Sequence, residues 1–235
     1  MTNITVPPGV SGRMLESNFD TIDLATVAAE QALTNLGDFE ALNFKIDLNR
    51  YKSEIAAFEK DWVDYLPRTD RVNNRQCLVL SNLEGKSHRD NPSLPQACME
   101  AKRRLSECDF NQKTIVYDQC KSLHPLLEEF QPLGRSFIVR CNMGGYFVPH
   151  RDHPEMPRES FRIVVFLNNC GAMEYDWIMG HDSKLNIEMG RAYYVNTRKV
   201  HRTISWVNNS QHLILNVPFT PNNVKKTISH LYFRH

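Results

Sequence analysis

Apolar residues in the first half of the chain recur at helical spacing. The clearest stripe has spacings of four and three residues: Tyr51, Ile55, Phe58, Trp62 and Tyr65. Such spacing places the side chains on one face of an amphipathic helix. Weaker helical patterns run through about residues 22–36, 93–108 (with Ser93 as the expected N-cap) and 123–130. We therefore expect residues 1–130 to be rich in helix.

The pattern changes after Gly134, where short apolar segments alternate with turns. Eight segments have strand-like sequences, at residues 136–141, 146–150, 161–167, 174–178, 185–188, 191–195, 203–207 and 212–217. Clusters of Gly, Asn, Pro and Asp separate them. Eight short strands at this spacing are typical of an all-β sandwich or barrel of the jelly-roll type.

These patterns predict a mainly β protein with N-terminal helices packed on the outside of a jelly-roll core. No internal repeat, low-complexity tract or linker is evident, so we expect residues 1–235 to form a single domain. Within it, residues 1–130 would pack on the barrel, residues 131–220 would form the β core, and residues 221–235 would form a C-terminal tail.

Composition and charge exclude several classes of protein. A hydrophobic content of 41% favours a folded chain over a disordered one. A formal net charge of +1 argues against a nucleic-acid binder that works by bulk electrostatics. The densest apolar run, at residues 163–167, is far shorter than a membrane span.

The cysteines and the N-terminal segment indicate a cellular compartment. The six cysteines include no C-x-x-C pair, and the first residues lack the basic start and apolar core of a secretory signal. Without such a signal, the cysteines are most simply free thiols in a reducing cytosol. We therefore expect a cytoplasmic protein that binds neither nucleic acid nor membrane, with its oligomeric state left open.

The segment from Gly144 to Asp152 carries the clearest candidate chemistry. His150 and Asp152 are two residues apart, so in an extended strand both side chains point to the same face. An imidazole and a carboxylate on one face supply two arms of a 2-His-1-carboxylate metal site. His201 follows Asp152 by 49 residues and enters a predicted strand, which makes it the candidate third ligand. Such a triad leaves adjacent positions open, as non-haem iron(II) needs to hold a cosubstrate and oxygen together.

The same tripeptide occurs a second time, as His88, Arg89 and Asp90. Its surroundings are polar, with no apolar strand beside it to fix the side chains, so we expect a surface turn. Neither copy fits the catalytic loop of protein kinases, because that loop needs an asparagine where this chain has Pro95 and Pro157.

Together these features resemble the Fe(II)- and 2-oxoglutarate-dependent oxygenases. The resemblance covers roughly residues 134–218 and is nearest to the aspartyl/asparaginyl β-hydroxylases and the free-proline hydroxylases. It rests on the strand at 135–141, the segment at 144–152, the strand that opens with Phe161 and Arg162, the segment at 190–197, His201, and a closing strand at 213–217. Members of this family share a double-stranded β-helix core with N-terminal helices packed against it.

The resemblance implies that His150, Asp152 and His201 are catalytic and hold Fe(II), with 2-oxoglutarate as cosubstrate and O₂ as oxidant. It implies oxidative decarboxylation of 2-oxoglutarate to succinate, coupled to hydroxylation of a substrate C–H bond. It further implies an amino-acid-like substrate, either a small molecule or part of a peptide or protein. The carboxylate of Asp152 favours hydroxylation, because related halogenases have a small residue at that position.

The far carboxylate of 2-oxoglutarate needs a cationic anchor, usually an arginine. The family commonly places it nine or ten residues beyond the distal histidine, where this chain has Ser210 and Gln211. Arg162 matches the family's other arginine and is the first candidate for this cosubstrate-binding role. Arg140, ten residues before the first metal ligand and on its face in a regular strand, is the second. His212 is a candidate polar helper.

Six cationic residues flank the two metal-ligand segments: Arg151, Arg158, Arg162, Arg198, Lys199 and Arg202. They form either a solvated rim or a cationic mouth that attracts carboxylates.

Two further hypotheses stay open for the whole protein. One is a cupin-type metal enzyme that uses the triad without 2-oxoglutarate, which the missing late arginine favours. The other is a non-catalytic β-barrel that binds a small acid or a partner protein.

Overall fold

The structure is a computed structural model of the chain, and it describes residues 23–65, 72–152, 158–170, 173–177 and 187–232. The helices are α1 (Leu24–Asn35), α2 (Leu48–Ile55), α3 (Leu94–Ala101), α4 (Ile115–Gln119), α5 (His124–Glu129) and α6 (Pro221–Ser229), with short 3₁₀ turns η1 (Ala56–Phe58), η2 (Glu107–Asp109) and η3 (Lys121–Leu123). The strands are β1 (Phe39–Lys45), β2 (Val63–Asp64), β3 (Val72–Asn82), β4 (Gln112–Lys113), β5 (Ser136–His150), β6 (Ser160–Asn168), β7 (Met173–Trp177), β8 (Arg191–Val195), β9 (His201–Ser205) and β10 (Ser210–Pro218).

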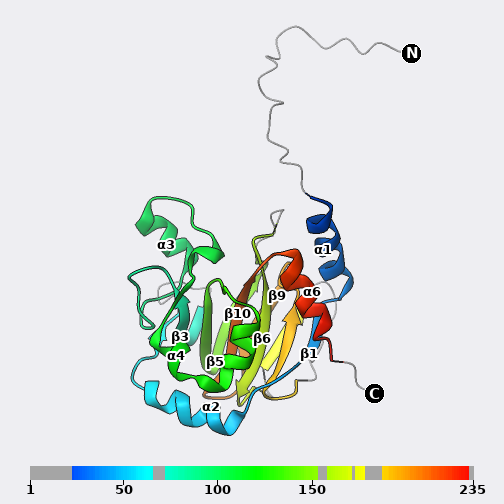
Figure 1. The fold of residues 1–235 in the computed structure, drawn as a ribbon. Helices are drawn as coiled ribbons and strands as arrows, with labels where there is room; N and C mark the ends of the chain where they lie inside the picture. The colour runs from blue at the N-terminus through cyan, green and yellow to red at the C-terminus, as the bar shows by residue number, and fades with distance from the viewer. Residues whose placement is uncertain (1–22, 66–71, 153–157, 171–172, 178–186, 233–235) are drawn as a thin grey trace, which may run out of the picture.

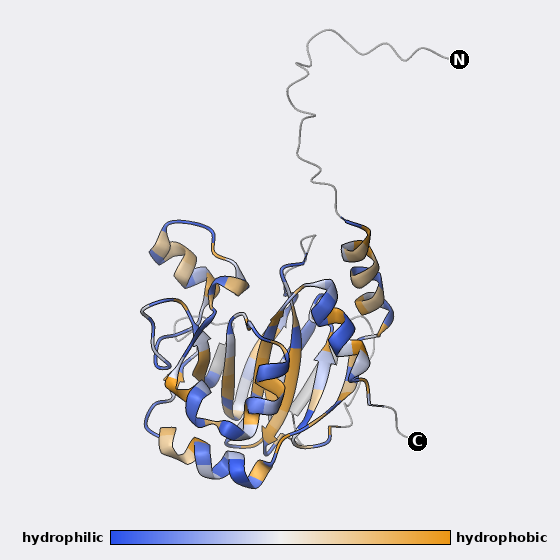
Figure 2. Ribbon diagram, in the orientation of Figure 1, coloured by the Kyte–Doolittle hydropathy of each residue, from blue (hydrophilic) through white to orange (hydrophobic). Residues whose placement is uncertain are grey.

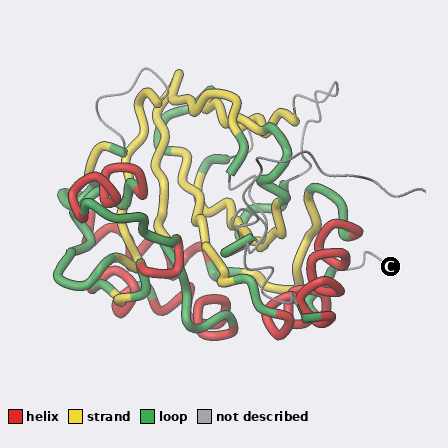
Figure 3. Tube along the Cα trace, turned by 90° about the horizontal axis from the view of Figure 1, so that it is seen from above, coloured by secondary structure: helices red, strands yellow, loops and turns green. Residues whose placement is uncertain are grey.

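The strands form an antiparallel sheet that folds over along β5 (Figures 1 and 3). Its main layer has the order β1-β8-β6-β10-β5-β3-β2. The second half of β5 also pairs with β9, which pairs in turn with β7. From β5 onward, successive strands therefore alternate between two layers. This alternation is the connectivity of a double-stranded β-helix, a form of jelly roll, and it confirms the predicted fold class.

The eight predicted strands correspond to six in the structure. The first two are one continuous strand, β5, which bends where Gly144 adopts a φ of +74°, a conformation that favours glycine. The strand predicted at 185–188 begins outside the described residues, and its last two residues are not in a strand. The other five predicted strands correspond to β6–β10, with ends shifted by a few residues.

The first half contains two long strands that the sequence pattern does not predict. β1 pairs with β8, and β3 pairs with β5, so these strands extend the core sheet on both sides. β3 carries the apolar run Cys77–Leu80, which is buried on both faces and therefore shows no two-residue alternation. The helix expected through Tyr65 ends earlier, because Val63 and Asp64 leave it to pair with β3. The segment expected to be a tail contains α6.

Alternate residues of the core strands face two different environments. In β6, Ile163 and Val165 pack in the main hydrophobic core with residues of α1, α2, α4, α5 and α6. Val164 and Phe166 face the interior of the jelly roll instead. Most of the helices lie along one side of the strands (Figure 3), and several helices contain many hydrophilic residues (Figure 2). None of the described helices is long and apolar enough to cross a membrane.

Candidate metal centre and its cavity

Three side chains converge where β5 and β9 meet at the end of the second layer. His150 is the last residue of β5 and pairs directly with His201, the first residue of β9. Asp152 follows two residues later, and its backbone N–H donates to the carbonyl of Thr197 over 2.9 Å. One potential ligand atom from each of the three side chains lies within 4.8 Å of the other two. The structure therefore brings the three predicted ligands together.

Both imidazoles are held with one nitrogen facing the point of convergence. Nδ1 of His150 lies 2.8 Å from the carbonyl of Val148, and Nδ1 of His201 lies 3.0 Å from that of Lys199. A carbonyl only accepts, so each Nδ1 carries a proton, and Nε2 is the ring nitrogen left to bind a metal. Burial lowers the pKa of His201 to about 4, although the Asp152 carboxylate opposes this shift. The His201 ring is therefore neutral at pH 7, as a metal ligand must be.

Asp152 presents Oδ1 to His150 and Oδ2 to both Arg162 and His201, whose Nε2 lies 3.9 Å from it. Its Oδ1 lies 3.4 Å from Nε2 of His150, while its Oδ2 accepts a hydrogen bond of 2.9 Å from Nε of Arg162. Burial raises the pKa of Asp152, but the Arg162 guanidinium and the two imidazoles outweigh it and hold the pKa well below its usual range. Two imidazoles and one ionised carboxylate fit a 2-His-1-carboxylate iron site.

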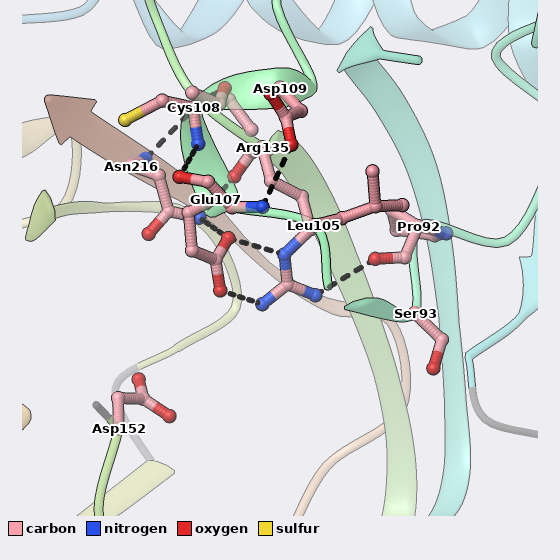
Figure 4. A network of polar contacts seen from close by, with 12 residues as sticks. Pro92, Ser93, Leu105, Glu107, Cys108, Asp109, Arg135, Asp152 and Asn216 are labelled. Carbon is pink, nitrogen blue, oxygen red and sulfur yellow. Dashed lines mark hydrogen bonds and ion pairs between the residues drawn. The ribbon is translucent and has the colours of Figure 1, made fainter. Parts of the chain in front are cut away.

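A buried series of alternating charges continues from Asp152 into the protein, and Figure 4 shows its inner members Glu107 and Arg135. Nη2 of Arg162 lies 3.7 Å from Oε1 of Glu107. Glu107 in turn accepts two hydrogen bonds from Arg135, over 2.6 and 2.8 Å, and one of 3.0 Å from Asn216. Arg162 is therefore buried, and two of its three guanidinium nitrogens face carboxylates of the protein itself.

Arg140 does not lie on the face of His150, so that expectation is wrong. Its guanidinium contacts Glu59 over 2.6 Å and stacks 4.4 Å above the ring of Trp62, on the helix-covered face of the sheet. The expectation assumed a regular strand, whereas the register of β5 shifts twice between Cys141 and His150, once against β3 and once against β9. Each shift breaks the two-residue alternation.

The metal-ligand candidates lie on the wall of a cavity of about 1030 Å³ inside the jelly roll. His212, the candidate polar helper, lies in this wall and is completely buried. Arg75 of β3 also lines the cavity, and the sequence analysis missed it. No short-range pattern marks it, because its place in the cavity depends on the pairing of β3 with β5.

Most of the cationic cluster that flanks the ligand segments is paired with acidic residues of the first half. Arg158 and Arg198 both donate to Oε1 of Glu30 in α1, each over 2.6 Å. Lys199 contacts Asp38 over 2.8 Å. These pairs attach α1 and the segment after it to the barrel. They leave less free positive charge at the mouth than the cationic-mouth hypothesis requires.

The second His-x-Asp tripeptide lies in a turn, as expected. Nε2 of His88 lies 3.0 Å from a carboxylate oxygen of Asp61, and Arg89 contacts the same carboxylate. Asp90 instead accepts a 2.7 Å hydrogen bond from the backbone of Ser87. His88 and Asp90 of this copy therefore bind different partners and do not converge on one point.

No protein-family model and no curated protein matches the sequence. Solved structures with a similar fold include a prolyl hydroxylase from Trichoplax adhaerens in complex with a peptide of the hypoxia inducible factor oxygen degradation domain, at 9% identity over 85% of this chain and 93% of that one, with a TM-score of 0.48. A Pseudomonas putida prolyl-4-hydroxylase has 12% identity over 84% of this chain and 100% of that one, with a TM-score of 0.44. A 2OG-Fe(II) oxygenase family oxidoreductase from Burkholderia pseudomallei has 12% identity over 81% and 88%, with a TM-score of 0.43.

Proposed function

We propose that this protein is an Fe(II)- and 2-oxoglutarate-dependent oxygenase. The observation that carries the proposal is the convergence of His150, Asp152 and His201 on the wall of a jelly-roll cavity, with ligand atoms within 4.8 Å of one another. The two Nδ1 hydrogen bonds to backbone carbonyls support it, because they prepare both rings for ligation through Nε2. When bound, Fe(II) would supply the redox chemistry that couples O₂ to the oxidation of 2-oxoglutarate and of a substrate C–H bond.

Side chains around the triad orient the carboxylate ligand and line the cavity. Arg162 holds the Asp152 carboxylate ionised and orients it through the 2.9 Å hydrogen bond. The cavity of about 1030 Å³ reaches the upper limit of ordinary small-molecule sites, so it has room for a cosubstrate and part of a substrate together. Leu94 and Met99 of α3 line it from one side, and Arg151 lines it beside the triad.

We propose that the substrate is an amino-acid side chain, free or within a peptide. The resemblance described in the sequence analysis suggests this class. The apolar contribution of α3 to the cavity wall is compatible with an aliphatic side chain whose C–H bond is oxidised. Screening of amino acids and short peptides for coupled succinate release would identify the substrate.

An anaerobic titration of Fe(II) and 2-oxoglutarate into metal-free protein, followed by visible absorption, tests the proposal. We expect a charge-transfer band that needs both components and is absent in His150→Ala. His88→Ala is the matched control, since it alters the other His-x-Asp tripeptide, and it should keep the band. Iron binding without the band would overturn the proposal in favour of a cupin-type enzyme. A failure to bind iron would favour a non-catalytic barrel.

A further inference from the structure

A second group of polar side chains lies in the same cavity as the metal-ligand candidates. It consists of Arg75 on β3, Thr203 on β9 and His212 on β10, and all three line the cavity. Their exposed fractions are 5%, 6% and 0%. Buried polar groups in proteins almost always have hydrogen-bond partners, so three buried polar side chains in one wall need an explanation.

Five atoms of these residues lack a hydrogen-bond partner among the described residues. They are Nε and Nη1 of Arg75, Oγ1 of Thr203, and both ring nitrogens of His212. The structure also shows no ion pair between Arg75 and a carboxylate of the described residues. An unpaired buried cation is costly unless something balances its charge. The group therefore has the properties of a binding site for an anion.

Aromatic rings fix the position of the Arg75 guanidinium. Its Cζ lies 5.3 Å from the ring centroid of Tyr65 and 5.1 Å from that of Phe147. Such contacts stabilise the cation and limit its orientations. They do not provide oxygen acceptors for Nε and Nη1, so the hydrogen-bonding capacity of the guanidinium stays available.

The chemistry of the group favours a carboxylate. A guanidinium presents two parallel N–H donors that match the two oxygens of a carboxylate. The Thr203 hydroxyl adds a third donor. Burial, together with the nearby Arg75 charge, lowers the pKa of His212 to about 3, so its ring is neutral and can donate one further N–H. One positive charge with several neutral donors suits a monovalent group better than a phosphate.

The anion group and the metal-ligand candidates are close neighbours. The Phe147 ring that lies beside Arg75 also packs on His150, with ring centroids 4.0 Å apart. Thr203 is two residues from His201 on β9, so both side chains point to the same face of that strand. A short molecule with an acid group at each end can therefore reach both positions.

We propose that Arg75, assisted by Thr203 and His212, binds the far carboxylate of 2-oxoglutarate, an inference that rests on the proposed function. Arg162 is less suited to this role, because Asp152 and Glu107 already face its guanidinium and because a carboxylate bound to it would lie against a metal ligand. The cationic anchor then comes from β3 in the first half of the chain, and not from the last core strand. His212 on that last strand contributes a neutral donor.

Binding of 2-oxo acids to protein loaded with Mn(II) under anaerobic conditions, measured by isothermal titration calorimetry, tests this assignment without turnover. We expect Arg75→Gln to raise the Kd for 2-oxoglutarate by about 10- to 100-fold and to leave the Kd for Mn(II) unchanged. Arg75→Lys should recover part of the loss. The matched control is Arg140→Gln on the opposite face of the sheet, which should bind 2-oxoglutarate like the wild type.

A second ligand identifies which end of the molecule Arg75 contacts. 2-Oxopentanoate has the same metal-binding end without the far carboxylate, so it should bind the wild type and Arg75→Gln equally. If Arg75→Gln does not fold, Thr203→Val removes one donor and should weaken 2-oxoglutarate binding several-fold with 2-oxopentanoate binding unchanged.

Three results would overturn the assignment in different ways. Equal 2-oxoglutarate affinity in the wild type, Arg75→Gln and Thr203→Val would refute the assignment of the anchor to Arg75 and leave the proposed function intact. Loss of 2-oxoglutarate binding in Arg162→Gln, with Mn(II) affinity retained and Arg75→Gln unaffected, would assign the anchor to Arg162. Binding of Mn(II) but not of 2-oxoglutarate by the wild type would refute the proposed function itself.

Discussion

The hydrogen bond of 2.9 Å from Nε of Arg162 to Oδ2 of Asp152 joins a cation inside the jelly roll to the acidic member of the candidate triad. Because the bond occupies one carboxylate oxygen, it leaves Oδ1 directed at His150. Outer partners of this kind orient a ligand and lower its proton affinity. Arg162 would therefore act on a bound metal through Asp152, as a positioning residue.

Replacement of Arg162 should weaken metal binding. In Arg162→Gln the carboxylate loses its cationic partner, so we expect the Kd for Fe(II) or Mn(II) to rise about 10- to 100-fold. The loss should be larger at pH 5 than at pH 7, because the pKa of Asp152 rises when the guanidinium is removed. Competition with a chelator of known affinity measures both effects. Unchanged metal affinity at both pH values would contradict this role.

The two His-x-Asp tripeptides allow the same aspartate substitution to be compared for its effect on metal binding. Asp152→Ala should abolish stoichiometric Mn(II) binding, because only two imidazoles would remain and the anionic ligand would be lost. Asp90→Ala makes the same change in the other copy, where the carboxylate binds Ser87 in a turn, and should retain one Mn(II) per chain. Calorimetric titration of both variants checks this. Equal metal content in the two would show that the ion binds elsewhere.

Glu107 should contribute strongly to stability, because it is the buried counter-charge of two arginines. Glu107→Gln leaves Arg135 without its full ion pair in the interior, and breaking a buried pair typically costs about 3–5 kcal/mol of unfolding free energy. Urea denaturation measures the change. Glu100→Gln is the matched control, since Glu100 forms an exposed pair with Lys86, and its midpoint should stay within error. Equal midpoints for both variants would contradict the prediction.

His212 should make the metal-free protein less stable in mild acid. Its pKa is about 3 in the folded state, against an ordinary value of 6.5, so between these values the unfolded chain binds a proton that the folded chain does not. Stability is therefore retained above pH 6.5 and falls as the pH drops toward 3, by about 1.4 kcal/mol per pH unit for this group.

The replacement His212→Gln isolates that contribution. Because glutamine does not titrate, the urea midpoints at pH 7 and pH 5 should differ less in the variant than in the wild type. His201 adds a similar term to both proteins, since burial also lowers its pKa, so the comparison cancels it. An identical pH dependence in the two proteins would show that His212 is not held in its neutral form.

The parts of the site that the sequence predicted depend on short-range geometry. His150 and Asp152 share a face because they are two residues apart, and β5–β10 follow from alternation and turn residues. Arg75 could not be found in this way, because its place in the cavity depends on the pairing of β3 with β5 across a long stretch of chain. Arg140 was misplaced for a related reason, since a register shift is a property of two strands and not of one.

The division of the sequence near residue 130 has no counterpart in the wall of the cavity. Glu107, which balances two interior arginines, and Arg75, the proposed acid anchor, both precede it, while the three metal-ligand candidates all follow it. A segment limited to the jelly roll would have unpaired edges on β8 and β5 and an uncompensated interior charge. The proposed acid-binding group draws on both halves, with Arg75 before the division and Thr203 and His212 after it, so substitutions in the first half can change acid binding while the three metal-ligand candidates stay as they are.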